Sequence, residues 1–267
     1  MVAALVLPVA MASAWLAAVV TDSDSYVDTV GPLASDETVQ EAAAGVLEGA
    51  AVRSVEQAGA RLDGARRAQV TAAVGMTVKS REFEEVWRTA NRTAHEQVVR
   101  VLEDKRRQEV DGRVVVELGP VVAAVARTLD DRGVLDASAV PPVQASLPLV
   151  PVDDLERART AYQLLDAAGF WVPALWLVLV VLALVIATDR ARALVWLAVG
   201  SIVGIVVLVL GLLGARGVLV AELGTAESDD VVRAIWDVLV SRLYWAAGVG
   251  AALAVAAIAV AVVLARR

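Results

Sequence analysis

Apolar residues gather into four long runs along the chain, at residues 2–20, 170–188, 193–215 and 244–265. Each run is close to the length of about 20 residues that a helix needs to cross the hydrocarbon core of a bilayer. Hydrocarbon offers no hydrogen-bond partners, so the backbone of each run must satisfy its own polar groups, which predicts helices. Only the polar stretch Asp189 to Arg192 separates the second run from the third, which predicts a tight helical hairpin. The pattern therefore predicts an integral membrane protein with four transmembrane helices.

The first run, residues 2–20, has two interpretations. Ala12, Ser13 and Ala14 offer the small side chains of a signal-peptide cleavage site. Against this, the run is longer than a usual signal-peptide core and no Lys or Arg precedes it. Because three further runs follow, we favour an uncleaved membrane anchor.

The polar segment between the first two runs, residues 21–168, is long enough for one independently packed domain. Its first residues, through Ser35, are rich in Asp and are expected to form an acidic, soluble exit from the membrane. Apolar residues then recur at helical spacing, most clearly after Ser80. Predicted helices cover about residues 36–58, 60–79 and 80–102, with Ser35 or Asp36 and then Ser80 as N-caps.

The second half of this segment changes its pattern. Alternating apolar residues predict a short strand within residues 109–118, beside a turn at Asp111 and Gly112. The other expected elements are a helix at 119–129, a loop or edge strand at the proline-rich residues 134–152, a helix at 153–169 and a polar loop at 216–242. The predicted fold class is an α-helical membrane protein whose four spans carry an α-rich domain with minor β structure.

Composition sharpens this picture, because 58% of the residues are hydrophobic and yet 21% are charged. The charges are segregated: residues 21–168 hold 25 acidic and 17 basic side chains. An acidic segment argues against nucleic acid, which requires clustered Lys and Arg, and against docking of this segment on anionic lipid. The chain has no cysteine, which excludes disulfides, thiol nucleophiles and Cys metal sites.

Basic residues also bear on orientation. Arg190 and Arg192 lie between the second and third runs, and Arg266 and Arg267 follow the fourth. The first Lys or Arg after the first run is Arg53, so the flank that has to cross the membrane is uncharged or acidic. The arginines on the other side make the raw count about even: Arg157, Arg159, Arg216, Arg233 and Arg242. The uncharged flank and the short turn and tail, on which the positive-inside rule counts most, decide the prediction, and we expect a multi-pass protein of the cell membrane with residues 21–168 extracytoplasmic.

Within the four runs there is no Asp, Glu, Lys, Arg or His. Transporters and proton pumps need such groups, so this absence lowers the expectation of transport. Small residues instead suggest close helix packing, within the chain rather than between copies. The pairs are Gly200 with Gly204, Gly248 with Ala252, and Ala247 with Ala251. An aromatic belt near the span ends is predicted at Trp171, Trp176, Trp196 and Trp245.

The polar segment offers one candidate interaction stripe, formed by Trp87, Asn91 and His95 on one strip of a helix. These side chains either contact a ligand or, as we favour, hydrogen-bond a neighbouring loop or helix end. No spacing typical of a metal, cofactor or catalytic site occurs. A calcium loop among the aspartates after the first run is disfavoured, because Tyr26 and Val27 stand where it requires a polar ligand and a glycine. No catalytic, cofactor-binding or metal-binding residue is therefore predicted.

Several segments together resemble a known group. They are the first apolar run, DSYVDTVGPLASDETVQ, FEEVWRTANRTAHEQVVRVL, VVVELGPVVAAVARTL and LERARTAYQLLDAAG before the hairpin. The chain resembles a group of actinobacterial four-span integral membrane proteins with a large extracytoplasmic loop between spans one and two. The resemblance implies an inward N-terminus and an outer helical domain, and it carries no catalytic residues.

Three functions are consistent with these patterns. The leading hypothesis is a non-enzymatic envelope protein whose outer domain binds or scaffolds a protein or lipid partner. An oligomeric channel or small-molecule permease is the alternative, although it requires a polar stripe along one span. An envelope hydrolase is the second alternative, and it requires His95 or an acidic pair in a cleft of the outer domain.

Overall fold

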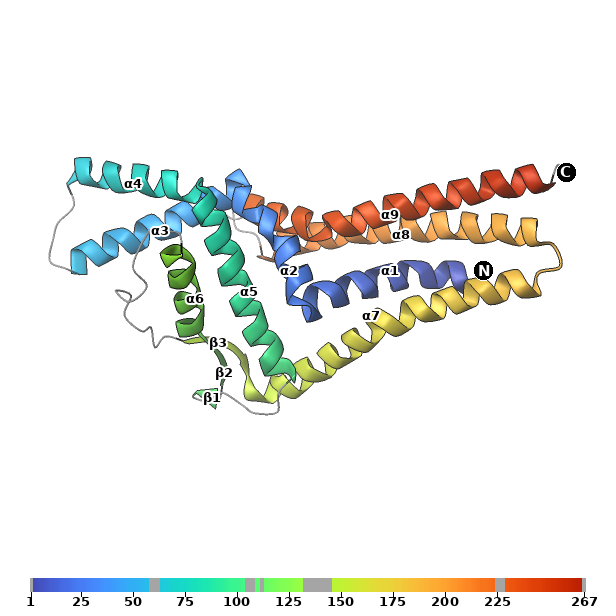
Figure 1. Ribbon diagram of the computed structural model, residues 1–267, viewed down its shortest axis with the longest axis horizontal. Coiled ribbons are helices and arrows are strands. Elements are labelled where there is room, and N and C mark those ends of the chain that lie inside the picture. Colours follow the sequence, from blue (N-terminus) through green and yellow to red (C-terminus); the bar gives the residue numbers. More distant parts are fainter. Residues whose placement is uncertain are drawn as a thin grey trace. The chain divides into compact units, whose positions relative to one another are not determined.

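A computed structural model describes residues 2–57, 63–103, 109–110, 113–131, 146–223 and 229–265 (Figure 1). The chain divides into two compact units, which are described separately. The membrane unit comprises Met1–Ser25, Glu156–Leu223 and Leu239–Arg267. The polar unit comprises Tyr26–Leu155 and Gly224–Val238.

Four helices among the described residues are long and apolar enough to cross a membrane, as the sequence predicted. They are α1 (Val2–Thr21), α7 (Val152–Ile186), α8 (Arg190–Leu223) and α9 (Asp229–Ala265). The protein is therefore a multi-pass α-helical membrane protein. The last three helices have 35, 34 and 37 residues. At 1.5 Å per residue each is about 50 Å long, which exceeds the roughly 30 Å hydrocarbon core.

Two predicted boundaries in this region are wrong. The helix expected to end at Gly169 continues as α7 through Gly169 and Pro173 to Ile186. The polar loop expected at 216–242 is mostly helix, because α8 extends to Leu223 and α9 begins at Asp229, while residues 224–228 lie outside the described part. Once a span has nucleated a helix, each further residue adds a hydrogen bond at little cost, so polar flanks continue it.

Helix α1 contacts each of the other three long helices. A side chain at Gly200 of α8 would collide with the Cβ of Ala4, and one at Gly169 of α7 would collide with the Cβ of Ala17. On α9, the backbone oxygen of Leu239 accepts a hydrogen bond of 3.1 Å from Trp15 Nε1. These contacts place α1 at the centre of the membrane unit (Figure 1).

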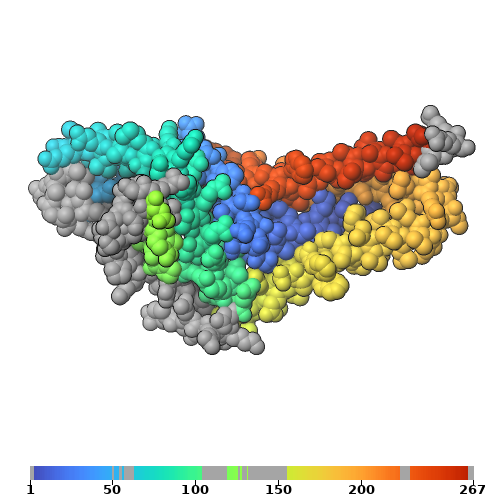
Figure 2. Space-filling model, in the orientation of Figure 1, coloured from blue at the N-terminus to red at the C-terminus, as the bar shows by residue number. Residues whose placement is uncertain are grey.

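Apart from Ala4 and Leu243, the buried residues on α1 and α9 recur at intervals of seven. They are Ala3, Ala10 and Ala17 on α1, and Val240, Ala247, Ala254 and Ala261 on α9. A spacing of seven keeps side chains on one face of a helix, so each helix buries one seam, which consists of alanines on α1 and of Val240 with alanines on α9. In contrast, the most apolar window of α7 contains no buried residue. Figure 2 shows the long apolar parts of α7 and α9 uncovered, as helices surrounded by lipid require.

The core of the polar unit is built around the segment expected to be a solvated exit. This segment forms α2 (Ser23–Val30) and the 3₁₀ helix η1 (Gly31–Ser35). Four of its apolar side chains are buried, together with two from the following helices: Val27, Val30, Leu33, Ala34, Val39 and Val78. The expectation of an acidic exit here is therefore wrong, because apolar side chains between the aspartates supply the core.

Helices α3 (Glu37–Gln57), α4 (Gly64–Val78) and α5 (Arg81–Glu103) follow, close to their predicted ranges. Asp36 is the N-cap of α3, because its Oδ1 accepts from the backbone N–H groups of Thr38 and Val39 at 3.0 and 3.2 Å. Ser80 caps α5 through its Oγ, which accepts from Phe83 N at 3.2 Å. Both caps confirm the sequence prediction.

A small antiparallel sheet completes the polar unit. Its strands are β1 (Glu109–Val110), β2 (Arg113–Glu117) and β3 (Ser146–Pro151), in the order β1-β2-β3, and α6 (Leu118–Asp130) lies between the last two in sequence. Of the loop or edge strand predicted at 134–152, residues 134–145 lie outside the described part, and the rest contains β3, an edge strand of this sheet. Its prolines have no N–H to donate to a second neighbour. The predicted turn at residues 111–112 lies outside the described residues.

Candidate functional site

The predicted stripe on α5 lies against α2 and the start of η1. Trp87 Nε1 donates a hydrogen bond of 3.0 Å to the backbone oxygen of Val30. Asn91 Nδ2 donates to the backbone oxygen of Trp87 at 2.9 Å, while Asn91 Oδ1 accepts from Tyr26 Oη at 3.3 Å. The ring of His95 stacks on Tyr26, with centroids 4.2 Å apart and planes 17° apart. The structure therefore brings all three residues of the stripe to one neighbouring segment of the same chain.

Tyr26 is the residue of this cluster that the sequence pattern missed. Its ring and hydroxyl join α2 to two successive turns of α5, at Asn91 and His95. Burial raises the pKa of the Tyr26 phenol above its usual value, because desolvation disfavours the phenolate. A single aromatic residue inside an acidic segment was the available signal for this anchor.

Two further polar side chains lie on or next to the same two helices, Gln97 on α5 and Asp22 just before α2. Gln97 on α5 is buried, and its Nε2 has no hydrogen-bond partner in the part of the chain that the structure describes. Asp22 is the first of the aspartates that follow the first apolar run, and its Oδ1 accepts from the backbone N–H of Ser25 at 2.6 Å, which caps α2. Across the described ranges, no three His, Asp or Glu side chains converge as a metal site would require.

The small residues singled out on α8 and α9 have different surroundings. A Cβ at Gly204 would lie 2.9 Å from the backbone oxygen of Ala4 and 3.0 Å from Pro8 Cδ, so Gly200 and Gly204 both face α1. A Cβ at Gly248 would meet nothing within 4 Å, and Ala252 is exposed. The expected packing of Gly248 and Ala252 inside the bundle is thus not found, whereas Ala247 of the other predicted pair is buried. Their neighbour Gly250 faces α8 instead, where a Cβ would lie 3.3 Å from Ile205 Cδ1.

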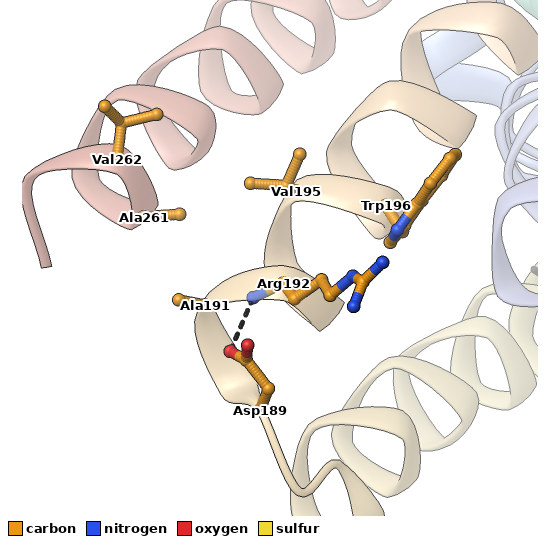
Figure 3. Close-up of a pocket in the computed structure, with 7 residues that line it drawn as sticks. All are labelled: Asp189, Ala191, Arg192, Val195, Trp196, Ala261 and Val262. Atoms are coloured by element: carbon orange, nitrogen blue, oxygen red, sulfur yellow. Dashed lines mark hydrogen bonds between the residues drawn. The ribbon is translucent and has the colours of Figure 1, made fainter. Parts of the chain in front are cut away.

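A cavity of about 670 Å³ lies in the membrane unit between the first turns of α8 and the last turns of α9 (Figure 3). The side chain of Asp189 accepts from the backbone N–H of Arg192 at 2.9 Å, which caps α8. The residues that line the cavity are Asp189, Ala191, Arg192, Val195, Trp196, Ala261 and Val262. Arg192 and Trp196 were noted in the sequence for charge and for the aromatic belt, but nothing in the sequence placed them opposite α9.

Fold and sites together define a four-span helical membrane protein with a helical polar unit encoded mainly between spans one and two. No protein family, curated protein or solved structure matches this chain. Its function must therefore be inferred from its own surfaces.

Proposed function

We propose that the protein is a non-enzymatic integral membrane protein of the bacterial cell envelope, and that its polar unit, on the extracytoplasmic side, binds a partner protein. The observation that supports this proposal is the lack of buried side chains, among those described, along most of helices α3 and α4. Residues 41–57 and 64–77, which we call the arm, form two adjacent helical segments in which none of the described side chains is buried.

Polar contacts at the surface hold the arm together. Thr71 Oγ1 donates to Glu48 Oε1 at 2.7 Å, and the guanidinium of Arg67 lies 3.3 Å from Glu56 Oε1. All four side chains are solvent-exposed or partly so, and exposed ion pairs contribute only about 0–1 kcal/mol. The arm therefore has little internal stabilisation beyond the helices themselves.

Apolar side chains are nevertheless present on the arm. Val46 and Met76 are 70% and 71% exposed, and Leu47 is also exposed. Burying one such side chain completely contributes about 1.5–3 kcal/mol. A protein surface that covered these three residues would supply the apolar burial that the arm lacks, which is the reason for choosing a protein as the partner.

The test is isolation of the native complex from membranes in a mild detergent, comparing the wild-type chain with the double variant Val46→Glu, Met76→Glu. We expect a stoichiometric protein partner with the wild type and at least a tenfold lower recovery with the double variant. Both substituted side chains are exposed, so the variant should retain its helical circular dichroism and its elution volume.

Leu164→Glu is the matched control, because Leu164 is 66% exposed, apolar and outside the arm. It should leave recovery of the partner unchanged. Isolation of a lone chain from wild-type membranes would overturn the proposal. Equal recovery with the double variant would remove the arm as its basis.

A further inference from the structure

The cavity between α8 and α9 lies at one boundary of the apolar band. Ala191 and Arg192 directly precede the third apolar run, and Val195 and Trp196 lie at its beginning. Ala261 and Val262 stand in the last turns of the fourth run. The cavity is therefore placed at the depth where the hydrocarbon of a bilayer gives way to phospholipid headgroups.

The polar side of this cavity carries a positive charge that is available to a ligand. Arg192 is exposed, and its guanidinium forms no ion pair with any described residue. Asp189 also lines the cavity, and its Oδ1 accepts a hydrogen bond of 2.9 Å from the backbone N–H of Arg192. Figure 3 shows the guanidinium extending away from this carboxylate and toward Trp196.

The other side of the cavity is apolar. Val195, Ala261 and Val262 supply aliphatic walls without a polar atom on their side chains. Trp196 is 59% exposed and Val262 is 42% exposed, so these walls continue into the surface that faces lipid. Tryptophan is enriched at this depth because its ring is amphipathic.

We propose that this cavity binds one anionic phospholipid, with the phosphate on the Arg192 guanidinium and the upper part of an acyl chain on Val195, Ala261 and Val262. Arginine holds phosphate through two parallel N–H···O bonds, and such a pair is stronger where water is scarce. A freely soluble phosphate would satisfy the guanidinium but would leave the apolar walls exposed. An arginine between two spans at the headgroup level is the type of donor that binds a lipid phosphate.

The experiment uses the full chain, purified in detergent and stripped of co-purified lipid. Phosphatidylglycerol or phosphatidylcholine is then titrated in, and bound lipid is counted by native mass spectrometry. We expect one tightly held phosphatidylglycerol on the wild type and at least fivefold weaker binding to Arg192→Gln. Arg190→Gln is the matched control, because Arg190 belongs to the same first turn of α8 but does not line the cavity. It should bind phosphatidylglycerol as the wild type does.

A second readout locates the lipid. In vesicles of phosphatidylcholine with 20 mol% phosphatidylglycerol brominated on its acyl chain, fluorescence quenching should be smaller for Trp196→Phe than for the wild type. Equal affinity of Arg192→Gln and wild type would overturn the proposal. It would also fail if phosphatidylcholine bound as tightly, if inorganic phosphate displaced the lipid, or if a second copy of the chain filled the cavity.

Discussion

Tyr26 links two elements through two kinds of contact, and these can be separated by substitution. Its hydroxyl donates to Asn91 Oδ1 at 3.3 Å, while its ring stacks on His95. A neutral hydrogen bond contributes about 0.5–1.5 kcal/mol net, and this long one belongs at the lower end. An aromatic pair contributes about 0.5–1.5 kcal/mol beyond the area that it buries.

Tyr26→Phe should therefore destabilise the protein by about 0.5 kcal/mol, since it loses only the hydroxyl, and His95→Ala by about 1–2 kcal/mol, since it loses the stacked ring. Both values are measured by denaturant unfolding of the full chain in detergent, followed by circular dichroism. Met76→Ala, at a side chain that is 71% exposed, is the control and should change little. A larger loss in Tyr26→Phe than in His95→Ala would show that the hydrogen bond is the stronger link.

The pH dependence of stability follows from the same side chain. Burial raises the pKa of Tyr26 in the folded protein, so the unfolded chain ionises first as pH rises above about 10. The contribution of the neutral Tyr26 side chain to the free energy of unfolding is therefore fully present below that pH, and it is lost as pH rises through the pKa of Tyr26 in the folded protein. The free energy of unfolding should fall from pH 9 to pH 11 more steeply in the wild type than in Tyr26→Phe. Parallel curves for the two proteins would contradict this assignment.

At the scale of the helices, α1 and α8 approach each other closely because glycines of α8 lie at the contact. A Cβ at Gly204 would lie 2.9 Å from the backbone oxygen of Ala4, and a backbone atom cannot turn aside as a flexible side chain can. Gly204→Val should destabilise the membrane unit by about 1–3 kcal/mol, the usual effect of overpacking. Unfolding in mixed micelles of rising SDS content, followed by circular dichroism, gives the measurement.

Gly214→Val is the matched control on the same helix. A Cβ at Gly214 meets nothing within 4 Å, so the same added volume should be tolerated there. If both variants were as stable as the wild type, α1 and α8 would not be in close contact in the membrane. If both lost stability, the effect would come from valine in the helix and not from the α1 contact.

Helices α5 and α2 show which elements could be predicted from the sequence alone and which could not. Helix α5 and its Ser80 cap were predictable, because a regular apolar period and a capping residue are local signals. Helix α2 was missed because it has eight residues, and its buried Val27 and Val30 are separated by charged and polar ones. Their burial depends on contacts with elements that follow much later in the chain, which no local pattern carries.

The candidate sites, like the helices, could be predicted only in part from the sequence. Trp87, Asn91 and His95 could be placed on one strip of a helix, but their partners Val30 and Tyr26 lie about 60 residues away in sequence. On α9 the pairs Gly248 with Ala252 and Ala247 with Ala251 came from a helix with small residues on every face, and Ala247 is the one of these four that is buried. The more informative signal was the recurrence of buried alanines at intervals of seven, as at Ala247, Ala254 and Ala261.

For the whole molecule, the number of spans determines which segments share a side of the membrane. Residues between spans one and two must lie opposite the turn between spans two and three, since one span separates them. Met76 on α4 and Thr188 in that turn are both exposed, and the chain has no native cysteine. Single variants Met76→Cys and Thr188→Cys therefore report the two sides without interference.

Intact spheroplasts are treated with a membrane-impermeant maleimide, and the same treatment is repeated after permeabilisation. Because the flank after span one carries no Lys or Arg before Arg53, we expect Met76→Cys to react in intact cells and Thr188→Cys only after permeabilisation. The opposite result would place the polar unit in the cytoplasm and remove the proposed envelope partner. Reaction of both variants in intact cells would mean that the chain does not cross the membrane between residues 76 and 188, and the α7 span itself would then be wrong.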